Sequence, residues 1–243
     1  PKDLLTIELG DVFPELKGKR VRGRLVGNKV LPYYSRADIV DHAKGAPPVL
    51  LWVDDPIELF FLQIQGSGRV KLPSGEMVRV GYADQNGHPY QSIGRVLIER
   101  GELQSSEASM QGIQAWARAN PAKLDELLNS NPSYVFFREL SPRLSPEEGP
   151  LGALGVPLLA ERTIAVDPRS IPLGAPVFLA TTRPNSEVPL RRLVMAQDTG
   201  GAIKGVVRAD FFWGFGAEAG AQAGRMKQAG QMWVLLPPGA APK

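Results

Sequence analysis

Cysteine is absent from the sequence, and histidine occurs only twice among its 243 residues, as His42 and His88. The lack of cysteine excludes disulfide bonds, thiol nucleophiles and cysteine-bound metal sites. With two histidines, a zinc site would need carboxylates for most of its ligands, which is an unusual donor set for zinc. We therefore expect no metal ion and no cofactor.

Long apolar runs are missing as well. No stretch of about eighteen consecutive apolar residues occurs, which is the length a membrane-spanning helix needs. The first residues, Pro1, Lys2 and Asp3, do not have the character of a signal peptide. The sequence therefore predicts no transmembrane segment in this chain.

Dense blocks of lysine and arginine are the third absence. The net charge is only +3, from 28 basic and 25 acidic side chains, and the pI is about 9.2. A mildly basic balance suits an anionic partner such as an acidic cell-wall polymer. Because the basic residues are not concentrated, we expect no nucleic-acid partner.

What the sequence does contain is typical of a globular protein rich in turns. Hydrophobic residues make up 43% of the chain, and 26 glycines and 22 prolines lie among short apolar runs. This pattern favours many short strands over long helices. Residues 141–149, rich in Pro, Ser and Glu, are the best candidate for a linker between residues 1–140 and residues 150–243.

The first of these two parts is predicted to mix strands and helices. Apolar runs predict strands at residues 4–7 and 21–26, and alternation around Ser74 and Gly75 predicts a β-hairpin. Residues 81–90 are expected to form a polar, aromatic loop. Capping residues and helical spacing of apolar residues predict helices at 36–42, from 56 onward, and at 92–100, 109–119 and 121–129.

The second part is predicted to be mainly β. Short strands at regular spacing, with one helix between the last two, favour a small barrel. The expected strands are residues 163–166, 177–180, 190–196, 205–209 and 232–236, and the expected helix is residues 217–228.

Two aspartates near the end of this part are candidates for chemistry. Asp198 precedes a glycine turn, and Asp210 comes twelve positions later, directly before three aromatic residues. On position alone, Asp198 is a turn former and Asp210 a helix N-cap, since these are common roles of aspartate beside glycine. A catalytic role is the alternative.

Six ordered blocks of sequence resemble one family. They are FFLQIQGSG at 60–68, GYADQNGHPYQSIGRVLI at 81–98, NPSYVFFRE at 131–139, AVDPRSIPLGAPVFL at 165–179, QDTGGAIKG at 197–205 and RADFFWGFGAEAG at 208–220. With these blocks the chain resembles the MltA family of membrane-bound lytic murein transglycosylases from residue 1 to about residue 236. The last three blocks resemble the family's 3D domain, named for three aspartates, which are Asp167, Asp198 and Asp210 here.

The resemblance implies a fold that is mainly β with some helices. It implies a double-psi β-barrel in the second part, a smaller β-rich domain with helices in the first, and a groove for a glycan strand between them. Members of the family carry a further segment ahead of the block that aligns with Pro1, which supplies strands to the barrel. The expectation for this chain is therefore a monomer with an incomplete barrel or a strand-exchanged dimer.

The resemblance also implies an activity, the non-hydrolytic cleavage of the MurNAc–GlcNAc bond of peptidoglycan to give 1,6-anhydromuramic acid ends. One aspartate, Asp210, would act first as general acid and then as general base. The residues themselves are compatible with this role, since the three aromatic residues that begin at Phe211 could desolvate the carboxyl and favour its protonated form. Because strand side chains alternate sides, not all three need face Asp210. Asp198 is expected to support it, and Asp167 either supports it or forms a structural turn.

Glycan binding is expected in two loops of the first part, which present amides, hydroxyls and aromatic rings. The candidate residues are Gln65, Gly66, Ser67, Gly68, Tyr82, His88 and Tyr90. The glycines would permit close approach of the backbone to a sugar, although a simple turn explains Gly66 to Gly68 equally well. His88 is expected to form hydrogen bonds and is not assigned catalysis.

The family's location would be the bacterial periplasm, with a lipid anchor to the outer membrane only in a full-length lipoprotein. Two other functions fit parts of the pattern. A non-catalytic peptidoglycan-binding module could use the same barrel. A dimeric aspartic protease is the other alternative, because residues 194–200 end in Asp-Thr-Gly, of which the chain has only one copy.

Overall fold

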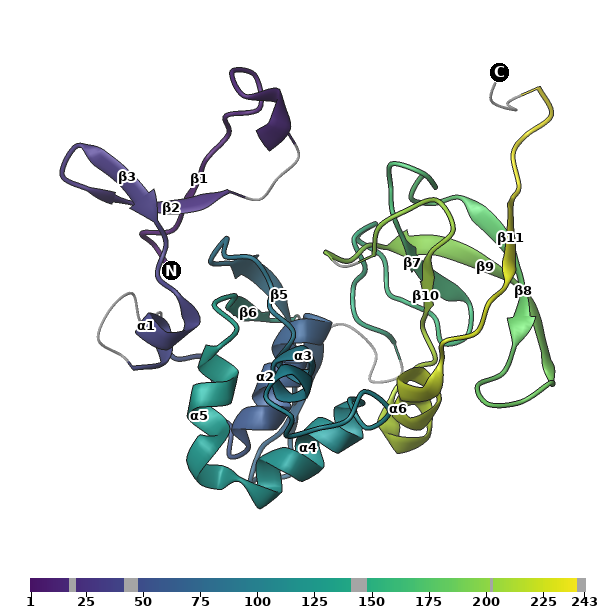
Figure 1. Cartoon of the computed structure of the whole chain (residues 1–243). Helices are drawn as coiled ribbons and strands as arrows, with labels where there is room; N and C mark the ends of the chain where they lie inside the picture. Colours follow the sequence, from purple (N-terminus) through teal and green to yellow (C-terminus); the bar gives the residue numbers. More distant parts are fainter. Residues whose placement is uncertain (18–20, 42–47, 141–147, 202, 240–243) are drawn as a thin grey trace. The chain divides into compact units, whose positions relative to one another are not determined.

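The computed structural model describes residues 1–17, 21–41, 48–140, 148–201 and 203–239. The chain divides into two compact units, Pro1–Ser141 and Pro142–Lys243 (Figure 1). Most of the predicted linker at residues 141–149 lies outside the described residues. Each unit has its own hydrophobic core.

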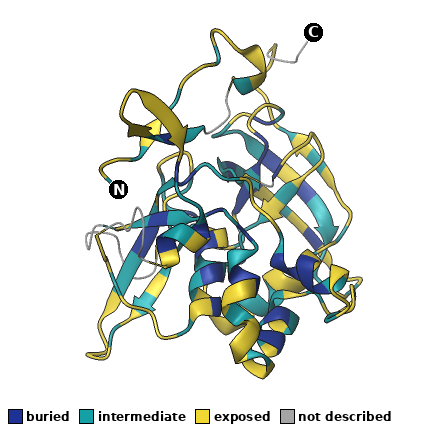
Figure 2. Cartoon of the chain, turned by 60° about the vertical axis from the view of Figure 1, so that its left-hand side comes forward, coloured by how far each residue is buried: buried dark blue, intermediate teal, exposed yellow. Residues whose placement is uncertain are grey.

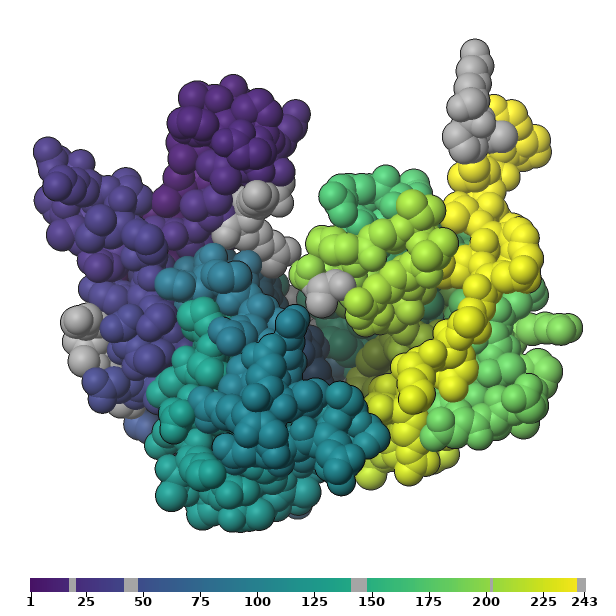
Figure 3. All heavy atoms as spheres, in the orientation of Figure 1, coloured from purple at the N-terminus to yellow at the C-terminus, as the bar shows by residue number. Residues whose placement is uncertain are grey.

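The first unit begins with a small antiparallel sheet of order β1-β2-β3. Its strands are β1 (Leu5–Thr6), β2 (Arg22–Val26) and β3 (Lys29–Pro32), and a 3-10 helix, η1 (Pro14–Leu16), lies between the first two. Gly27 takes a positive φ of 60° at the turn that joins β2 to β3. The resulting hairpin stands out from the helices of this unit, and every residue of β3 is exposed (Figures 1 and 3).

The rest of the described part of this unit contains five α-helices and a second antiparallel sheet, of order β4-β5-β6, against which α2 packs. The strands are β4 (Ser67–Lys71), β5 (Met77–Gln85) and β6 (Val135–Glu139), and the helices are α1 (Arg36–Val40), α2 (Pro56–Gln65), α3 (Ile93–Glu99), α4 (Met110–Ala119) and α5 (Pro121–Asn129). Side chains of Ser35, Asp55, Ser92 and Ser109 accept hydrogen bonds at the starts of α1 to α4, as the capping pattern predicted. Helices α2 to α5 bury a shared apolar core.

Two features of this unit differ from the sequence-based prediction. Strand β5 runs to Gln85, so the first half of the expected loop at residues 81–90 pairs with β6 instead. The unit is also the longer of the two, and its described helices cover more residues than its described strands, so it is not a smaller, β-rich domain.

The apolar run at residues 49–53 has no regular secondary structure, and Trp52 is 79% exposed.

The second unit is built on one five-stranded sheet of order β10-β7-β9-β8-β11. Its strands are β7 (Thr163–Val166), β8 (Pro176–Thr182), β9 (Pro189–Asp198), β10 (Ala209–Phe211) and β11 (Gln231–Val234), and its helix is α6 (Gly216–Arg225). Strands β7 and β9 are parallel, and the other pairs are antiparallel. Alternate residues of the strands bury one face of the sheet around Ile164, Val177 and Val194 (Figure 2).

The strand predicted at residues 205–209 is wrong. Gly205 has a positive φ of 101°, and the chain remains irregular until Ala209, where β10 begins. Asp210 therefore lies in the middle of a strand and is neither a loop residue nor a helix N-cap. The coarse fold, mainly β with some helices, is confirmed.

Candidate active site

The sheet of the second unit places Asp198 and Asp210 on one face, in a single row. Strand β7 lies between β9 and β10, and Ala165 of β7 is the register partner of both Asp198 and Asp210. Two strand spacings separate the aspartates, which corresponds to about 10 Å between their Cα atoms. Ala209 and Phe211, the neighbours of Asp210, point to the opposite face and pack on the core. Both carboxylates therefore leave the sheet on the side away from the core.

A β-bulge brings Asp198 into this row. The register between β7 and β9 shifts after Ile164, so that Ala165 pairs with Asp198 and not with Gln197. The half-buried carboxylate accepts a hydrogen bond from the Ala153 N–H at 2.9 Å. Burial raises the pKa of Asp198, and backbone hydrogen bonds from Thr199 and Ala153 oppose this in part. Asp198 is therefore easier to protonate than an ordinary aspartate.

The loop that carries Ala153 is fixed against the end of β9. The Leu154 N–H donates to the Gln197 carbonyl at 3.0 Å, and the Thr163 hydroxyl bonds to the Gln197 side chain at 2.7 Å. Gly152 must be glycine for this contact, because a Cβ there would lie 2.5 Å from the Gln197 carbonyl oxygen. The loop thus covers Gln197 and partly covers Asp198.

Asp210 is more open to solvent than Asp198. Its side chain is 49% exposed and forms a two-point ion pair with Arg208, from Nε to Oδ1 at 3.0 Å and from Nη2 to Oδ2 at 3.3 Å. Of the three aromatic residues expected to desolvate Asp210, Phe211 and Trp213 do not cover its carboxylate. Phe211 faces the core, and its ring meets that of Trp213 at 4.9 Å, on the far side of the sheet from the carboxylate.

Asp167 has a different environment, because it is buried at the end of β7. Arg169 donates to both of its oxygens, at 3.1 and 2.7 Å, and the Gly205 N–H donates at 2.9 Å. These hydrogen bonds from Arg169 and Gly205 hold the pKa of Asp167 well below its usual range. Asp167 therefore stays ionised and anchors the loop that leads from β9 to β10.

The glycan-binding candidates around the start of β4 have clear structural roles. Gly66 ends α2 in the left-handed conformation, with φ of 78°, and a Cβ on it would lie 3.9 Å from that of Tyr82. Ser67 and Gly68 are the first residues of β4, and a Cβ on Gly68 would lie 2.3 Å from Leu62. The structure thus brings Gly66 beside Tyr82, while Gln65 is exposed at the end of α2.

The other two candidates, His88 and Tyr90, lie in the loop that follows β5. The His88 Nε2–H donates to the Tyr33 carbonyl at 2.7 Å, which ties the loop to the chain before α1. Tyr90 is 52% exposed and lies near the buried guanidinium of Arg36. His88 is therefore a structural hydrogen-bonding residue, and Tyr90 is the more available of the two for a ligand.

Three contacts of these sites were not predicted from the sequence. Arg208 received no role, although strand alternation places it on the same face as Asp210, and this spacing is the signal that identifies it. The cover of Asp198 by Ala153 joins residues far apart in the chain and has no local signal. Asn86 is fully buried and binds the Tyr34 and Pro132 carbonyls, each at 2.8 Å, so it organises the His88 loop.

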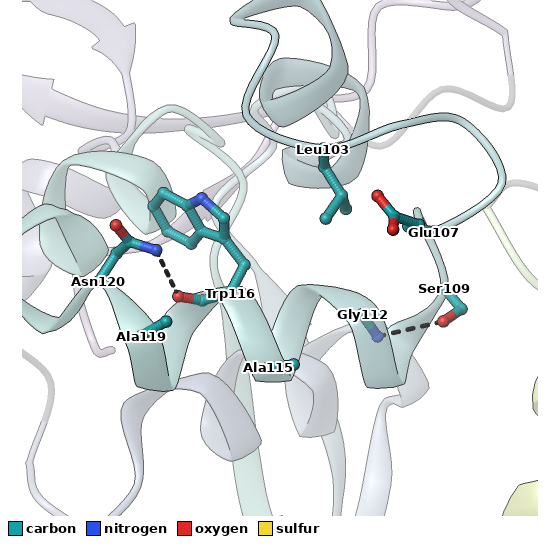
Figure 4. A pocket seen from close by; sticks show the side chains of 8 residues that line it. All are labelled: Leu103, Glu107, Ser109, Gly112, Ala115, Trp116, Ala119 and Asn120. Carbon is teal, nitrogen blue, oxygen red and sulfur yellow. Dashed lines mark hydrogen bonds between the residues drawn. The ribbon is translucent and has the colours of Figure 1, made fainter.

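An open hollow of about 490 Å³ lies elsewhere, along α4 (Figure 4). It contains none of the candidate residues, and its polar groups are engaged, since Ser109 caps Gly112 and the Asn120 amide donates to the Trp116 carbonyl. The described residues contain no cluster of potential metal ligands. In the described part of the chain, no helix combines the length and apolarity needed to cross a membrane.

The spacing and exposure of Asp198 and Asp210 limit the acid–base chemistry that this unit can perform. Asp198 and Asp210 are too far apart to share a proton, so they do not form an aspartic-protease pair within one chain. A single exposed carboxylate, with a second one along the same face, can instead donate and accept a proton at a substrate lying on the sheet. The geometry therefore favours one acting residue and one supporting residue.

Comparison with known proteins matches both units. Residues 1–138 match the family MltA, described as the MltA specific insert domain, and residues 162–236 match the 3D domain. Membrane-bound lytic murein transglycosylase A of Escherichia coli (strain K12) is 38% identical over 209 residues, which cover 83% of this chain and 55% of that protein. The chain spans about half the length of the curated relatives it matches.

Solved structures agree with these matches. The crystal structure of MltA from Neisseria gonorrhoeae, monoclinic form, is 52% identical and superposes with a TM-score of 0.82, covering 92% of this chain and 57% of that one. The structure of E. coli MltA with bound chitohexaose is 35% identical, with a TM-score of 0.74, and covers 84% of this chain and 61% of that one. With an insert domain followed by a 3D domain, this chain belongs to the MltA family of lytic murein transglycosylases.

Proposed function

We propose that this chain cleaves the β-1,4 bond between N-acetylmuramic acid and N-acetylglucosamine in peptidoglycan without water, leaving 1,6-anhydromuramic acid ends. The observation that carries the proposal is the row of Asp198 and Asp210 on one face of the 3D-domain sheet. The family supports the substrate class, since its named members are murein transglycosylases. The chitohexaose bound to E. coli MltA is a glycan of the same linkage type.

Asp210 is the proposed acid and base. Its protonated carboxyl gives a proton to the glycosidic oxygen as the bond from that oxygen to C1 of the muramic acid breaks. The resulting carboxylate then takes the proton of the C6 hydroxyl of the same sugar, while the C6 oxygen bonds to C1. No water enters and no atom is lost, so a single carboxyl is sufficient.

Asp210 is chosen over Asp198 because it is accessible. Its side chain is 49% exposed, whereas Asp198 is partly covered and accepts the Ala153 N–H. Arg208 occupies both oxygens of Asp210, so it must leave one of them before that oxygen can carry the proton. Such an exposed ion pair contributes only about 0–1 kcal/mol, and a bound glycan can displace it. Asp198 would add negative charge along the same face.

The remaining expectations belong to the same proposal. The five-stranded sheet would be part of a double-psi β-barrel, joined through a linker at residues 141–149 to the unit that precedes it. Gln65, Gly66, Ser67, Gly68, Tyr82, His88 and Tyr90 would contact the glycan strand. The protein would act in the bacterial periplasm, at the outer membrane in a lipoprotein form, as a monomer or a strand-exchanged dimer.

Mass spectrometry of murein digests tests the reaction. Products of a transglycosylase lack the water that a hydrolase adds, so anhydromuropeptides are expected from the wild-type chain. Asp210→Asn should lower their release at least about a hundredfold, which is the usual contribution of a general acid. Glu187→Gln, which removes another exposed carboxylate of the second unit, should leave the rate unchanged.

Two results would contradict the proposal. Reducing muramic acid ends in the products would show hydrolysis in place of transglycosylation. If the wild-type chain sediments with murein but releases nothing soluble, the chain is a binding module.

A further inference from the structure

Three large apolar side chains form an exposed row on the second unit. Leu193 of β9, Phe178 of β8 and Trp233 of β11 are register partners across three adjacent strands. They are 47%, 38% and 47% exposed, although their strand neighbours Val177 and Val194 are buried in the core. Apolar groups gathered on one side of a sheet, and not scattered singly, are typical of an interaction surface.

The two rings of this row lie side by side. The centroids of Phe178 and Trp233 are 5.9 Å apart, with an angle of 46° between the ring planes. The next row along the strands, about 7 Å away, is Arg191, Ala180 and Gln231. Ala180 is small and lies beside the rings, whereas Arg191 and Gln231 place polar, exposed groups at either side of it. Planar rings bordered by hydrogen-bonding groups suit a sugar, which has an apolar C–H face and a rim of hydroxyls.

The row lies on the same face of the sheet as the two aspartates. Along β9, Arg191, Leu193 and Met195 point away from the core, and the bulge returns Asp198 to that side. Asp198 lies five positions after Leu193, which is about 17 Å along an extended strand. A polymeric glycan is long enough to lie at both places, whereas a short oligosaccharide held at Asp210 reaches only one.

We propose that Phe178 and Trp233 form a glycan-stacking platform, a second carbohydrate site that holds a polymeric murein strand away from the catalytic carboxylate. The ligand is the uncharged sugar backbone, stacked on the rings, with Arg191 and Gln231 at its hydroxyls. This inference rests on the proposed function for its ligand class. It assigns the platform a role in binding polymer and none in the chemical step.

The test removes the rings and keeps the apolar bulk. Phe178→Leu and Trp233→Leu are made in the Asp210→Asn background, so that binding is measured without cleavage, and Trp52→Leu is the control because Trp52 is an exposed tryptophan of the other unit. Binding is measured by sedimentation with purified murein and with chitin, a neutral glycan. Each platform variant should bind both polymers at least about fivefold more weakly, as expected when an aromatic anchor is lost. The control should bind as before.

Rates on two substrates separate the platform from the active site. For this measurement the substitution is made in the chain that keeps Asp210. Trp233→Leu should then slow the digestion of insoluble murein and leave the cleavage of a short soluble murein glycan unchanged. Thermal unfolding of each variant shows whether the cross-strand ring pair also stabilises the sheet. Unchanged binding of both polymers by folded Phe178→Leu and Trp233→Leu would overturn the platform and leave the proposed function intact. Ring-dependent binding by a wild-type chain that releases no product would overturn the proposed function and leave the platform.

Discussion

Three aspartates of the same unit differ in their surroundings, and these differences determine what each can do. Asp167 is buried and bonded to Arg169, Asp198 is half-buried beneath a loop, and Asp210 is exposed beside Arg208. Only the first has both oxygens held by charged and backbone donors within the protein interior. The side-chain type is therefore a poor guide to function, and the partners of each carboxylate are a better one.

The substitution Asp198→Asn should change thermal stability and activity in different directions. The raised pKa of Asp198 means that folding disfavours its ionised form, so near neutral pH its charge costs stability. Asparagine keeps an oxygen that can accept the Ala153 N–H and removes the charge. We expect an unfolding temperature equal to or above that of the wild type, together with slower release of anhydromuropeptides. A large loss of thermal stability would show that the ionised carboxylate is structural.

Asp167→Asn should have the opposite effect on stability, and that effect should depend on pH. The pKa of Asp167 is lowered in the folded state, so its ionised form stabilises the fold at every pH above its ordinary value of about 4. This stabilisation disappears as the pH falls through the lowered folded-state pKa. The difference in unfolding temperature between wild type and variant should therefore be largest near neutral pH and shrink in acid. The Glu187→Gln variant provides the baseline, and a difference independent of pH would refute this role for Asp167.

At the scale of elements, short strands depend on contacts outside their ladders. Strand β10 has only three residues, and its continuation is held by two hydrogen bonds, from the Glu161 N–H to the Phe212 carbonyl at 2.7 Å and from the Phe212 N–H to the Thr163 carbonyl at 3.0 Å. Glu161 reaches this position with a positive φ of 56°, which is uncommon for a residue other than glycine. These contacts fix the edge strand that carries Asp210.

Helix α1 depends on Arg36 in a similar way. The Arg36 guanidinium is buried, donates to the Asn131 and Ser133 carbonyls at 3.1 and 2.8 Å, and lies over the rings of Phe60 and Tyr134. No ion pair of Arg36 occurs within the described part of the chain, and burial lowers the pKa of Arg36 to about 10. The arginine thus joins α1 to the segment before β6 through carbonyl groups.

Arg36→Leu should destabilise the first unit by about 2 kcal/mol, because two buried carbonyl groups lose their charged donor. Urea unfolding followed by circular dichroism measures this change. Arg95→Leu serves as the control, since Arg95 pairs with Glu99 at an exposed site and such pairs contribute less than about 0.5 kcal/mol. Equal effects of the two substitutions would mean that the buried contacts of Arg36 add nothing to stability.

Elements defined by contacts between residues close in sequence were predicted, whereas an element defined by contacts between distant residues was not. Helices α2 to α5 were predicted from residues within a few positions of one another, such as Asp55 before Pro56, because caps and apolar spacing are local. The β4–β5 hairpin was predicted for the same reason. The strand expected at residues 205–209 failed, since β10 is defined by hydrogen bonds to β7, some forty positions earlier in the sequence.

For the candidate site, the sequence identified the aspartates but not their roles. The exposure of Asp210 depends on which face of β10 it occupies, and its aromatic neighbour Phe211 proved to lie on the other face. The burial of Asp198 depends on Ala153, which is 45 positions away. For Asp167 the sequence left two roles possible, support of Asp210 or a structural turn. Its partners Arg169 and Gly205 favour a role in anchoring the loop.

At the scale of the molecule, each unit holds an independent core, formed in one case by helices and in the other by a sheet. Basic and acidic side chains are equal in number, 17 of each, in residues 1–141, whereas residues 142–243 contain 11 basic and 8 acidic ones. The whole positive excess of the chain therefore belongs to the unit with the three aspartates. A small positive excess in this unit suits the acidic polymer proposed as its substrate.

Ala165 has a consequence that reaches beyond its own small side chain. It separates Asp198 from Asp210, and the width of that separation is set by the main-chain hydrogen bonds of three strands. Substitutions around the site can alter the acidity of either carboxylate without changing the distance between the two Cα atoms. Proton affinity and spacing are therefore independent variables in this site, so mutation and selection can adjust the first while the peptide backbone keeps the second constant.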